Sequence, residues 1–282
     1  MTELFDFEET SHRLGGDWGL HYHEAGEGPV LVLLHGSGPG VSGWSNFKAN
    51  FPVFAGHFRT IIMDMPGFGL SPQGKLDRRY PEVAADGLLH LLDSLAIERC
   101  HLLGNSMGGA VTMQFALNYP DRAERLVMMG PGGVNVIGPP LSEGGKRLNE
   151  FLSNPTREGM VAWVETMVAD MSKVSEELID ERMANALRPG SIESAREIFA
   201  NINDRRFRDD VPVWALTNRI RHPALITWGR DDRMVPLENG LLPFRRMPNA
   251  EMHIFSRCGH WAQVERKTDF ERVVLEFLLR TA

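Results

Sequence analysis

Cysteine is nearly absent from this sequence of 282 residues, and long apolar runs are missing altogether. The two cysteines, Cys100 and Cys258, stand far apart and in no metal-like spacing, which excludes a disulfide scaffold and is typical of a reducing compartment. No apolar run approaches the roughly 18 residues that a membrane span needs. The first residues are acidic where a signal peptide would be basic. We therefore expect a soluble, cytoplasmic protein without a membrane partner.

Positive charge is scarce as well. Lys and Arg total 30 against 37 Asp and Glu, which gives a formal net charge of −7. Such a chain lacks the positive charge that binds phosphate backbones, so nucleic acid is not an expected partner. The apolar fraction of 43% and the charged fraction of 24% are those of an ordinary globular protein, and they exclude a disordered or collagen-like chain.

Short apolar runs alternate with longer runs of helical period. The run Val30-Leu31-Val32-Leu33-Leu34 is apolar at consecutive positions, as in strands that are covered on both faces. The alternation predicts an α/β fold with a mostly parallel central sheet flanked by helices. The predicted strands are His21–Ala25, Val30–His35, Thr60–Asp64, Cys100–Gly104, Arg125–Gly130, Ala224–Gly229 and Glu251–Ser256, and the predicted helices are Trp44–Phe54, Val83–Leu95, Met107–Asn118 and Val264–Leu279.

The alternation is interrupted between 134 and 213, where the pattern is helical. Asn154-Pro155 is a helix start with a capping residue before a proline, and a second helix opens at Ser175 and stops before Pro189. An inserted helical block between two halves of a βα series predicts three segments. These are a first part of an α/β core (1–133), a helical cap (134–213) and a second part of the core (214–282).

The segment Gly104-Asn105-Ser106-Met107-Gly108 is a G-x-S-x-G motif. It lies where a predicted strand meets a predicted helix, the setting in which a serine adopts a strained backbone conformation and exposes its hydroxyl at the end of the strand. Glycines flank the serine because strand and helix approach too closely there for a Cβ atom. The motif predicts that Ser106 is a nucleophile.

A serine hydroxyl needs a base, and in this architecture the acid and then the histidine follow the serine along the chain. His260 is the only histidine that follows Ser106 and an acid in a loop after a late strand. The acid comes from the loop after Ala224–Gly229, where spacing alone leaves Asp231 and Asp232 open.

An oxyanion hole needs two backbone N–H groups. One is predicted to be that of Met107, at the start of the helix. The other is expected from the glycine-rich loop after Val30–His35, with Ser37 as the first candidate and Gly38 as the second.

Two further patterns suggest other ligands. The stretch from Gly38 to Gly43 matches the dinucleotide-binding pattern G-x-G-x-x-G, with Asp64 as the acid for the ribose. Pro39 removes one amide donor, and the match begins well past the end of the strand, so we do not favour this interpretation. His21 and His23 could suggest a metal, but alternate positions on an edge strand are more simply exposed residues, and no metal is expected.

The motifs together resemble the meta-cleavage product hydrolases of the α/β-hydrolase superfamily, and the resemblance covers nearly the whole chain. The resembling segments are His35-Gly36-Ser37-Gly38-Pro39-Gly40, Gly43-Trp44-Ser45-Asn46, Gly104-Asn105-Ser106-Met107-Gly108-Gly109, Trp228-Gly229-Arg230-Asp231-Asp232-Arg233-Met234-Val235-Pro236 and Cys258-Gly259-His260-Trp261-Ala262-Gln263.

The resemblance implies an α/β-hydrolase fold and a serine-dependent hydrolase without a cofactor. The implied substrate is a 2-hydroxy-6-oxo-hexa-2,4-dienoate, a ring-fission product of aromatic degradation that is cleaved between C5 and C6. Relatives of this kind are commonly homo-oligomers. The implied site residues are the triad Ser106, Asp232 and His260, the oxyanion-hole residues Ser37 and Met107, and the substrate-binding residues Gly38, Asn46, Asn105, Arg182 and Trp261.

Arg182 has support from the sequence itself. On a helix it shares the apolar face with Leu178, Ile179, Met183 and Ala186, where a cation needs a partner. A substrate carboxylate or a local acid would serve. The nearby stripe of Met160, Trp163, Met167 and Met171 is interpreted mainly as the packing surface between cap and core, with one or two members contacting substrate.

Two alternatives stay open at this point. A carboxylesterase, lactonase or thioesterase of the same fold would use the same triad and oxyanion hole without needing Arg182, Asn46 and Asn105 together. A non-catalytic ligand-sensing protein of the same fold is the second alternative, and such proteins often lose a triad residue.

Overall fold

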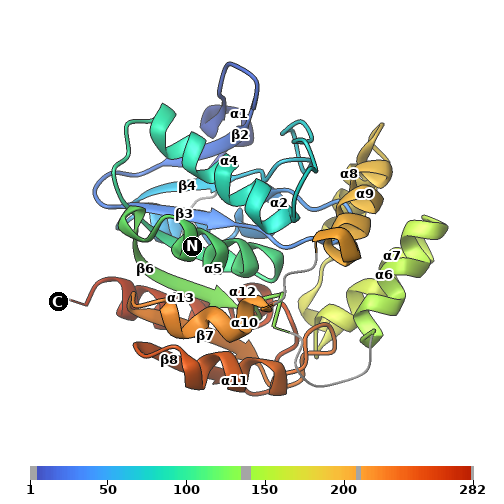
Figure 1. Cartoon of the computed structure of the whole chain (residues 1–282). Helices are drawn as coiled ribbons and strands as arrows, with labels where there is room; N and C mark the ends of the chain where they lie inside the picture. Colours follow the sequence, from blue (N-terminus) through green and yellow to red (C-terminus); the bar gives the residue numbers. More distant parts are fainter. Residues whose placement is uncertain (1–4, 135–140, 208–210, 281–282) are drawn as a thin grey trace.

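The computed structural model describes residues 5–134, 141–207 and 211–280, in which eight strands form one sheet. The strand order is β1-β2-β4-β3-β5-β6-β7-β8. The pairings β1–β2 and β2–β4 are antiparallel, and every other pairing is parallel (Figure 1). The strands are β1 Ser11–Arg13, β2 His21–Ala25, β3 Val30–Leu34, β4 Arg59–Met63, β5 Cys100–Asn105, β6 Ala123–Met129, β7 Ala224–Gly229 and β8 Ala250–Phe255.

The sheet has an apolar layer on each face. Val32 and Leu34 of β3 point into one layer, and Leu31 and Leu33 point into the other, because successive side chains of a strand alternate between its faces. The first layer is covered by α4 (Tyr80–Ser94), α5 (Met107–Asn118), α10 (Val213–Leu216) and α11 (Glu238–Arg246), and the second by α2 (Gly43–Phe47), α3 (Phe51–Ala55), α12 (Ala262–Glu265) and α13 (Lys267–Leu278). This arrangement confirms the predicted α/β fold, a mostly parallel central sheet flanked by helices.

Four further helices lie together at one side of the sheet (Figure 1). Their buried side chains form a separate apolar cluster, which Trp261 of the core joins. The predicted cap bounds, 134–213, stay a prediction, and 135–140 and 208–210 lie outside the described residues. The four helices are α6 Glu143–Ser153, α7 Arg157–Met167, α8 Glu176–Ala186 and α9 Ser191–Asn203.

Three predicted helices differ from the observed ones. The expected helix Trp44–Phe54 is divided into α2 and α3, because Pro52 has no N–H group with which to continue a helical ladder. The expected helix Val264–Leu279 is divided into α12 and α13 at Arg266, which has φ −123°. The helix expected to start at Asn154-Pro155 begins at Arg157 instead, capped by the Thr156 hydroxyl, which accepts from the Gly159 N–H at 3.1 Å.

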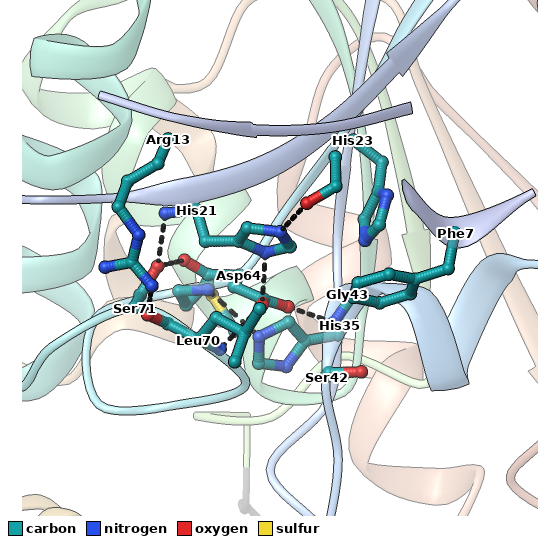
Figure 2. Close-up of polar contacts among 12 residues, drawn as sticks. Phe7, Arg13, His21, His23, His35, Ser42, Gly43, Asp64, Leu70 and Ser71 are labelled. Carbon is teal, nitrogen blue, oxygen red and sulfur yellow. Dashed lines mark hydrogen bonds and ion pairs between the residues drawn. The ribbon is translucent and has the colours of Figure 1, made fainter. Parts of the chain in front are cut away.

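The prediction that His21 and His23 are exposed edge residues is wrong. The short strand β1 pairs with β2 and removes it from the edge, so both histidines are buried. His21 Nδ1 bonds Asp64 Oδ2 at 2.8 Å (Figure 2). His21 Nε2 bonds the Ser11 hydroxyl at 2.8 Å. Asp64, the acid of the dinucleotide interpretation, is thus buried and already bonded to protein groups, which removes the basis of that interpretation.

Several short elements had no prediction. They are α1 (Phe7–Thr10), β1, α10 and α11, together with four short 3₁₀ segments within the described residues. The longer helices α6 and α9 were not predicted individually, but they lie in the segment that was expected to be helical. None of the described helices combines the length and the apolar character needed to cross a membrane.

Candidate active site

Ser106 stands at the turn between β5 and α5 with φ 51° and ψ −110°, a conformation that non-glycine residues rarely adopt. Its neighbours leave no room for side chains. A Cβ atom on Gly104 would lie 2.3 Å from the Gly108 carbonyl oxygen, and one on Gly108 would lie 2.1 Å from the Leu34 carbonyl oxygen. The turn therefore requires both glycines of the motif, and it holds the serine in a strained conformation.

Asp232 and His260 lie in the loops after β7 and β8 and are bonded to each other. His260 Nδ1 and Asp232 Oδ2 are 2.6 Å apart, and both side chains are buried. The Met234 and Val235 N–H groups donate to Asp232 Oδ1, each at 2.8 Å, which fixes the carboxylate. Asp231 instead is exposed and pairs with Arg230. The structure thus distinguishes the two aspartates that spacing left open.

His260 Nε2 is buried and has no hydrogen-bond partner among the described residues. His260 and Ser106 line the same cavity. No hydrogen bond joins the two side chains directly. Such contacts are often long in a free enzyme and tighten once substrate is bound.

Eight of the ten predicted site residues line this cavity. Met107 and Asp232 are the two that do not line it. Met107 is the first residue of α5, where N–H groups have no acceptor within the helix. The eight lining residues are Ser37, Gly38, Asn46, Asn105, Ser106, Arg182, His260 and Trp261.

Arg182 of α8 is buried, with 3% of its surface exposed, and no carboxylate pairs with it among the described residues. Its Nη1 donates to the Pro39 carbonyl at 3.2 Å, and its guanidinium carbon lies 4.5 Å from the centre of a Trp261 ring. Burial lowers the pKa of Arg182 to about 10, so the side chain is still a cation at neutral pH. The cavity therefore contains a positive charge without a negative partner.

Three nitrogen donors of the cavity lining are buried and unpartnered. They are Asn46 Nδ2, Trp163 Nε1 and Arg182 Nε. No aspartate or glutamate is among the described residues that line the cavity. Leaving a buried donor without a hydrogen bond costs about 1–3 kcal/mol. Such a cluster is therefore typical of a binding site whose ligand supplies the hydrogen-bond acceptors.

Another part of the lining is apolar. Leu148 of α6, Met167 of α7 and Met234 line the cavity together, and a Cβ atom on Gly144 would touch Met234 Sδ at 2.7 Å and Met167 Cε at 3.1 Å. The two thioether side chains thus converge beside the start of α6.

Two members of the predicted methionine stripe line the cavity and two do not. Trp163 and Met167 are lining residues, whereas Met160 and Met171 pack within the cluster of the four cap helices. The sequence analysis gave no role to Leu148, Met234 or Val41, which also line the cavity. Met234 lies two residues after Asp232 in a quoted motif, but Leu148 stands on a helix that was not predicted.

Comparison with known proteins identifies the family. The profile of the family described as alpha/beta hydrolase fold matches residues 29–267. The 2-hydroxy-6-oxo-6-phenylhexa-2,4-dienoate hydrolase of Comamonas testosteroni is 37% identical over 99% of both chains. The 2-hydroxy-6-oxononadienedioate/2-hydroxy-6-oxononatrienedioate hydrolase of Burkholderia vietnamiensis strain G4 is 42% identical over 94% of this chain and 93% of that one.

Solved structures agree with these relatives. The 2-hydroxy-6-oxo-6-phenylhexa-2,4-dienoate hydrolase from Rhodococcus sp. strain RHA1 matches with a TM-score of 0.87 and 28% identity over 99% of this chain and 100% of that one. A meta-cleavage product hydrolase from Pseudomonas fluorescens IP01 matches with a TM-score of 0.83 and 32% identity over 92% of this chain and 94% of that one. The strained serine, the bonded aspartate–histidine pair and these likenesses agree: the chain belongs to the α/β-hydrolase fold family and, within it, to the meta-cleavage product hydrolases.

Proposed function

We propose that this protein hydrolyses the C5–C6 bond of 2-hydroxy-6-oxo-hexa-2,4-dienoates with Ser106 as nucleophile, His260 as base and Asp232 as the group that orients His260. The 2.6 Å bond between Asp232 and His260 Nδ1 supports these roles, because it leaves Nε2 to take the serine proton. Met107 and Ser37 are the proposed oxyanion donors. No metal or organic cofactor takes part.

The main support for a dienoate as the substrate comes from the unpartnered hydrogen-bond donors of the cavity. Arg182 supplies an uncompensated buried cation, and Asn46 and Trp163 add N–H groups without acceptors. A carboxylate with an adjacent enol or keto oxygen would satisfy all three, and charge-assisted bonds of this kind are the strong ones. A simple ester offers no such group. The same donors therefore favour the dienoate over an ester, lactone or thioester.

The proposed reaction starts with the transfer of the 2-hydroxyl proton to C5, which converts the dienol into its keto form. Ser106 Oγ then attacks C6 while His260 Nε2 takes its proton, and the oxyanion accepts the Ser37 and Met107 N–H groups. The C5–C6 bond breaks, its electron pair passes to the departing dienolate, and His260 returns the proton. Water then hydrolyses the acyl-enzyme to release the acid.

Conversion of a 6-phenyl dienoate tests this function. Ring-fission products are coloured, so the protein is expected to bleach the compound and release benzoate and 2-hydroxypenta-2,4-dienoate. An esterase would hydrolyse 4-nitrophenyl acetate without bleaching the dienoate. A ligand-sensing protein would raise its melting temperature with the dienoate but turn over neither compound. Either result would overturn the proposal.

The cavity also favours an apolar substituent at C6. The named relatives divide between a phenyl group and a second carboxylate at this end of the substrate. Leu148, Met167 and Met234 offer that end no cation, whereas methionine adapts readily to alkyl and aryl shapes. Burying an unpaired carboxylate there would cost about 3 kcal/mol, which corresponds to about 100-fold in kcat/KM.

We therefore expect kcat/KM for the 6-phenyl dienoate to exceed that for 2-hydroxy-6-oxononadienedioate by about 100-fold. Steady-state bleaching rates with the two compounds measure the ratio. The variant Met234→Lys would supply a cation for the second carboxylate and should therefore lower this ratio of kcat/KM values. Equal kcat/KM values for the two compounds in the unaltered protein would contradict the proposed preference for an apolar substituent at C6. They would not contradict the proposed reaction.

The remaining proposals concern the division of the chain into cap and core, its assembly and its location. We propose that the segment 134–213 acts as the cap over the core segments 1–133 and 214–282, since α7 and α8 supply Trp163, Met167 and Arg182 to the cavity. Assembly as a homo-oligomer and a cytoplasmic location stay predictions.

A further inference from the structure

His35 is a buried histidine to which neither the predicted site nor the proposed reaction gives a role. It follows β3 directly and is fully buried, with its ring 5.2 Å from that of Phe68. The next residues, Gly36 and Ser37, line the cavity beside Ser106.

The hydrogen bonds of His35 determine its tautomer. The Met65 N–H donates to His35 Nε2 at 3.0 Å, and because a backbone N–H can only donate, this nitrogen carries no proton. The proton is therefore on Nδ1, which donates to the Gly36 carbonyl at 2.6 Å. Burial also lowers the pKa of His35, which keeps the ring neutral.

The Gly36 carbonyl shares a peptide group with the Ser37 N–H. A trans peptide is planar, and its C=O and N–H point in opposite directions. A ring that holds the carbonyl oxygen in one direction therefore holds the Ser37 N–H in the other. The His35 carbonyl is fixed as well, because it accepts from the Gly108 N–H at 3.0 Å, next to the second proposed donor, Met107.

The anchor for this arrangement is the end of β4. Asp64 accepts from the Gly43 N–H at 2.6 Å and from the Leu70 N–H at 2.9 Å, and so fixes the far end of the same loop (Figure 2). Met65, the next residue, is the donor to His35. One short segment thus fixes both ends of the loop that carries Ser37.

We infer that His35 is a positioning residue that aims the Ser37 N–H at the oxyanion by holding the Gly36 carbonyl through its Nδ1–H group. This inference rests on the proposed function, because it assumes that Ser106 attacks a carbonyl. His35 itself does not touch the substrate: it does not line the cavity, and it acts through the peptide that it orients.

Two substitutions separate this role from simple support of the fold. In His35→Asn the amide nitrogen can take the place of Nδ1 and still donate to Gly36, but the acceptor for Met65 is lost. In His35→Gln the amide oxygen can take the place of Nε2 and accept from Met65, but the donor to Gly36 is lost. Each variant therefore keeps one bond and loses the other.

We expect His35→Gln to lower kcat by about 10- to 100-fold with little change in KM, since a single oxyanion donor accounts for about 10²–10³ in kcat and is here misdirected rather than removed. His35→Asn should keep kcat within about threefold of the unaltered protein and yet show the larger drop in melting temperature, because it leaves a buried N–H unbonded. A tetrahedral boronic acid adduct at Ser106 should be weakened at least tenfold in His35→Gln, and benzoate binding should not change.

A purely supporting role predicts the reverse order. In that case kcat would fall with melting temperature, His35→Asn would be the poorer enzyme, and boronate and benzoate binding would weaken together. Any of these results would overturn the inference. Failure of the proposed function is distinguishable, because the unaltered protein would then fail to bleach the dienoate.

Discussion

Replacement of Ser106 with alanine is expected to lower kcat for dienoate cleavage by about 10⁴-fold or more, the loss that removal of a triad nucleophile causes in serine hydrolases. The variant removes the only hydroxyl at the turn between β5 and α5, and neither His260 nor the oxyanion donors can replace it as a nucleophile. Bleaching of the 6-phenyl dienoate under single-turnover conditions measures the loss.

Substrate binding should survive this change, because Arg182 and Asn46 stay in place. We expect Ser106→Ala to bind the dienoate within a few-fold of the unaltered affinity. Its melting temperature should be equal or higher, since a residue kept for its chemistry commonly costs stability. Ser94→Ala, at the exposed end of α4, is the matched control and should be fully active. Retention of a tenth of the activity by Ser106→Ala would exclude Ser106 as the nucleophile.

The second large effect concerns Arg182. Arg182→Gln is expected to lower kcat/KM for the dienoate by about 10²–10³-fold, because truncating one partner of a buried, hydrogen-bonded charge pair costs about 2–5 kcal/mol. The same variant should hydrolyse 4-nitrophenyl acetate within a few-fold of the unaltered rate, because that ester has no carboxylate to pair with the cation. Steady-state kinetics with both compounds measure the contrast.

Arg188→Gln supplies the control for this experiment. Arg188 follows the same helix, α8, but is exposed, so its loss should change neither activity. Arg182 also packs against the rings of Trp163 and Trp261, and a packing role would affect both compounds. Equal losses on the dienoate and the ester would therefore contradict the proposed contact with the carboxylate.

The sequence predicts the core of this molecule well because the relevant signals are local. The apolar runs of β3 and β5 are buried on both faces, and a G-x-S-x-G motif between strand and helix can form only the strained turn observed at Ser106. The carboxyl ends of parallel strands meet at one edge, so a histidine and an aspartate after late strands come together there. That is why His260 could be named without a structure.

The cavity is less predictable because its wall comes from several helices whose faces are fixed only by packing. Leu148 is a single position on α6, whose first turn holds two glycines, Gly144 and Gly145, that disfavour a helix. The choice of Trp163 and Met167 over Met160 depends on how α7 is rotated against the core. The burial of His21 and His23 depends on β1, whose three residues, Ser-His-Arg, carry no apolar pattern. Contacts of this kind are set by tertiary structure, which overrides local preference.

The order of the strands has a consequence for biosynthesis. Ser106 leaves the ribosome with β5, whereas Asp232 follows only after the four helices of the inserted segment and β7, and His260 follows only after β8 as well. Because chains fold progressively from the N-terminus as they are made, a nascent polypeptide carries its hydroxyl without a base. A chain that has been made only as far as the inserted helices is therefore expected to be inactive, and activity is expected only once His260 has been added.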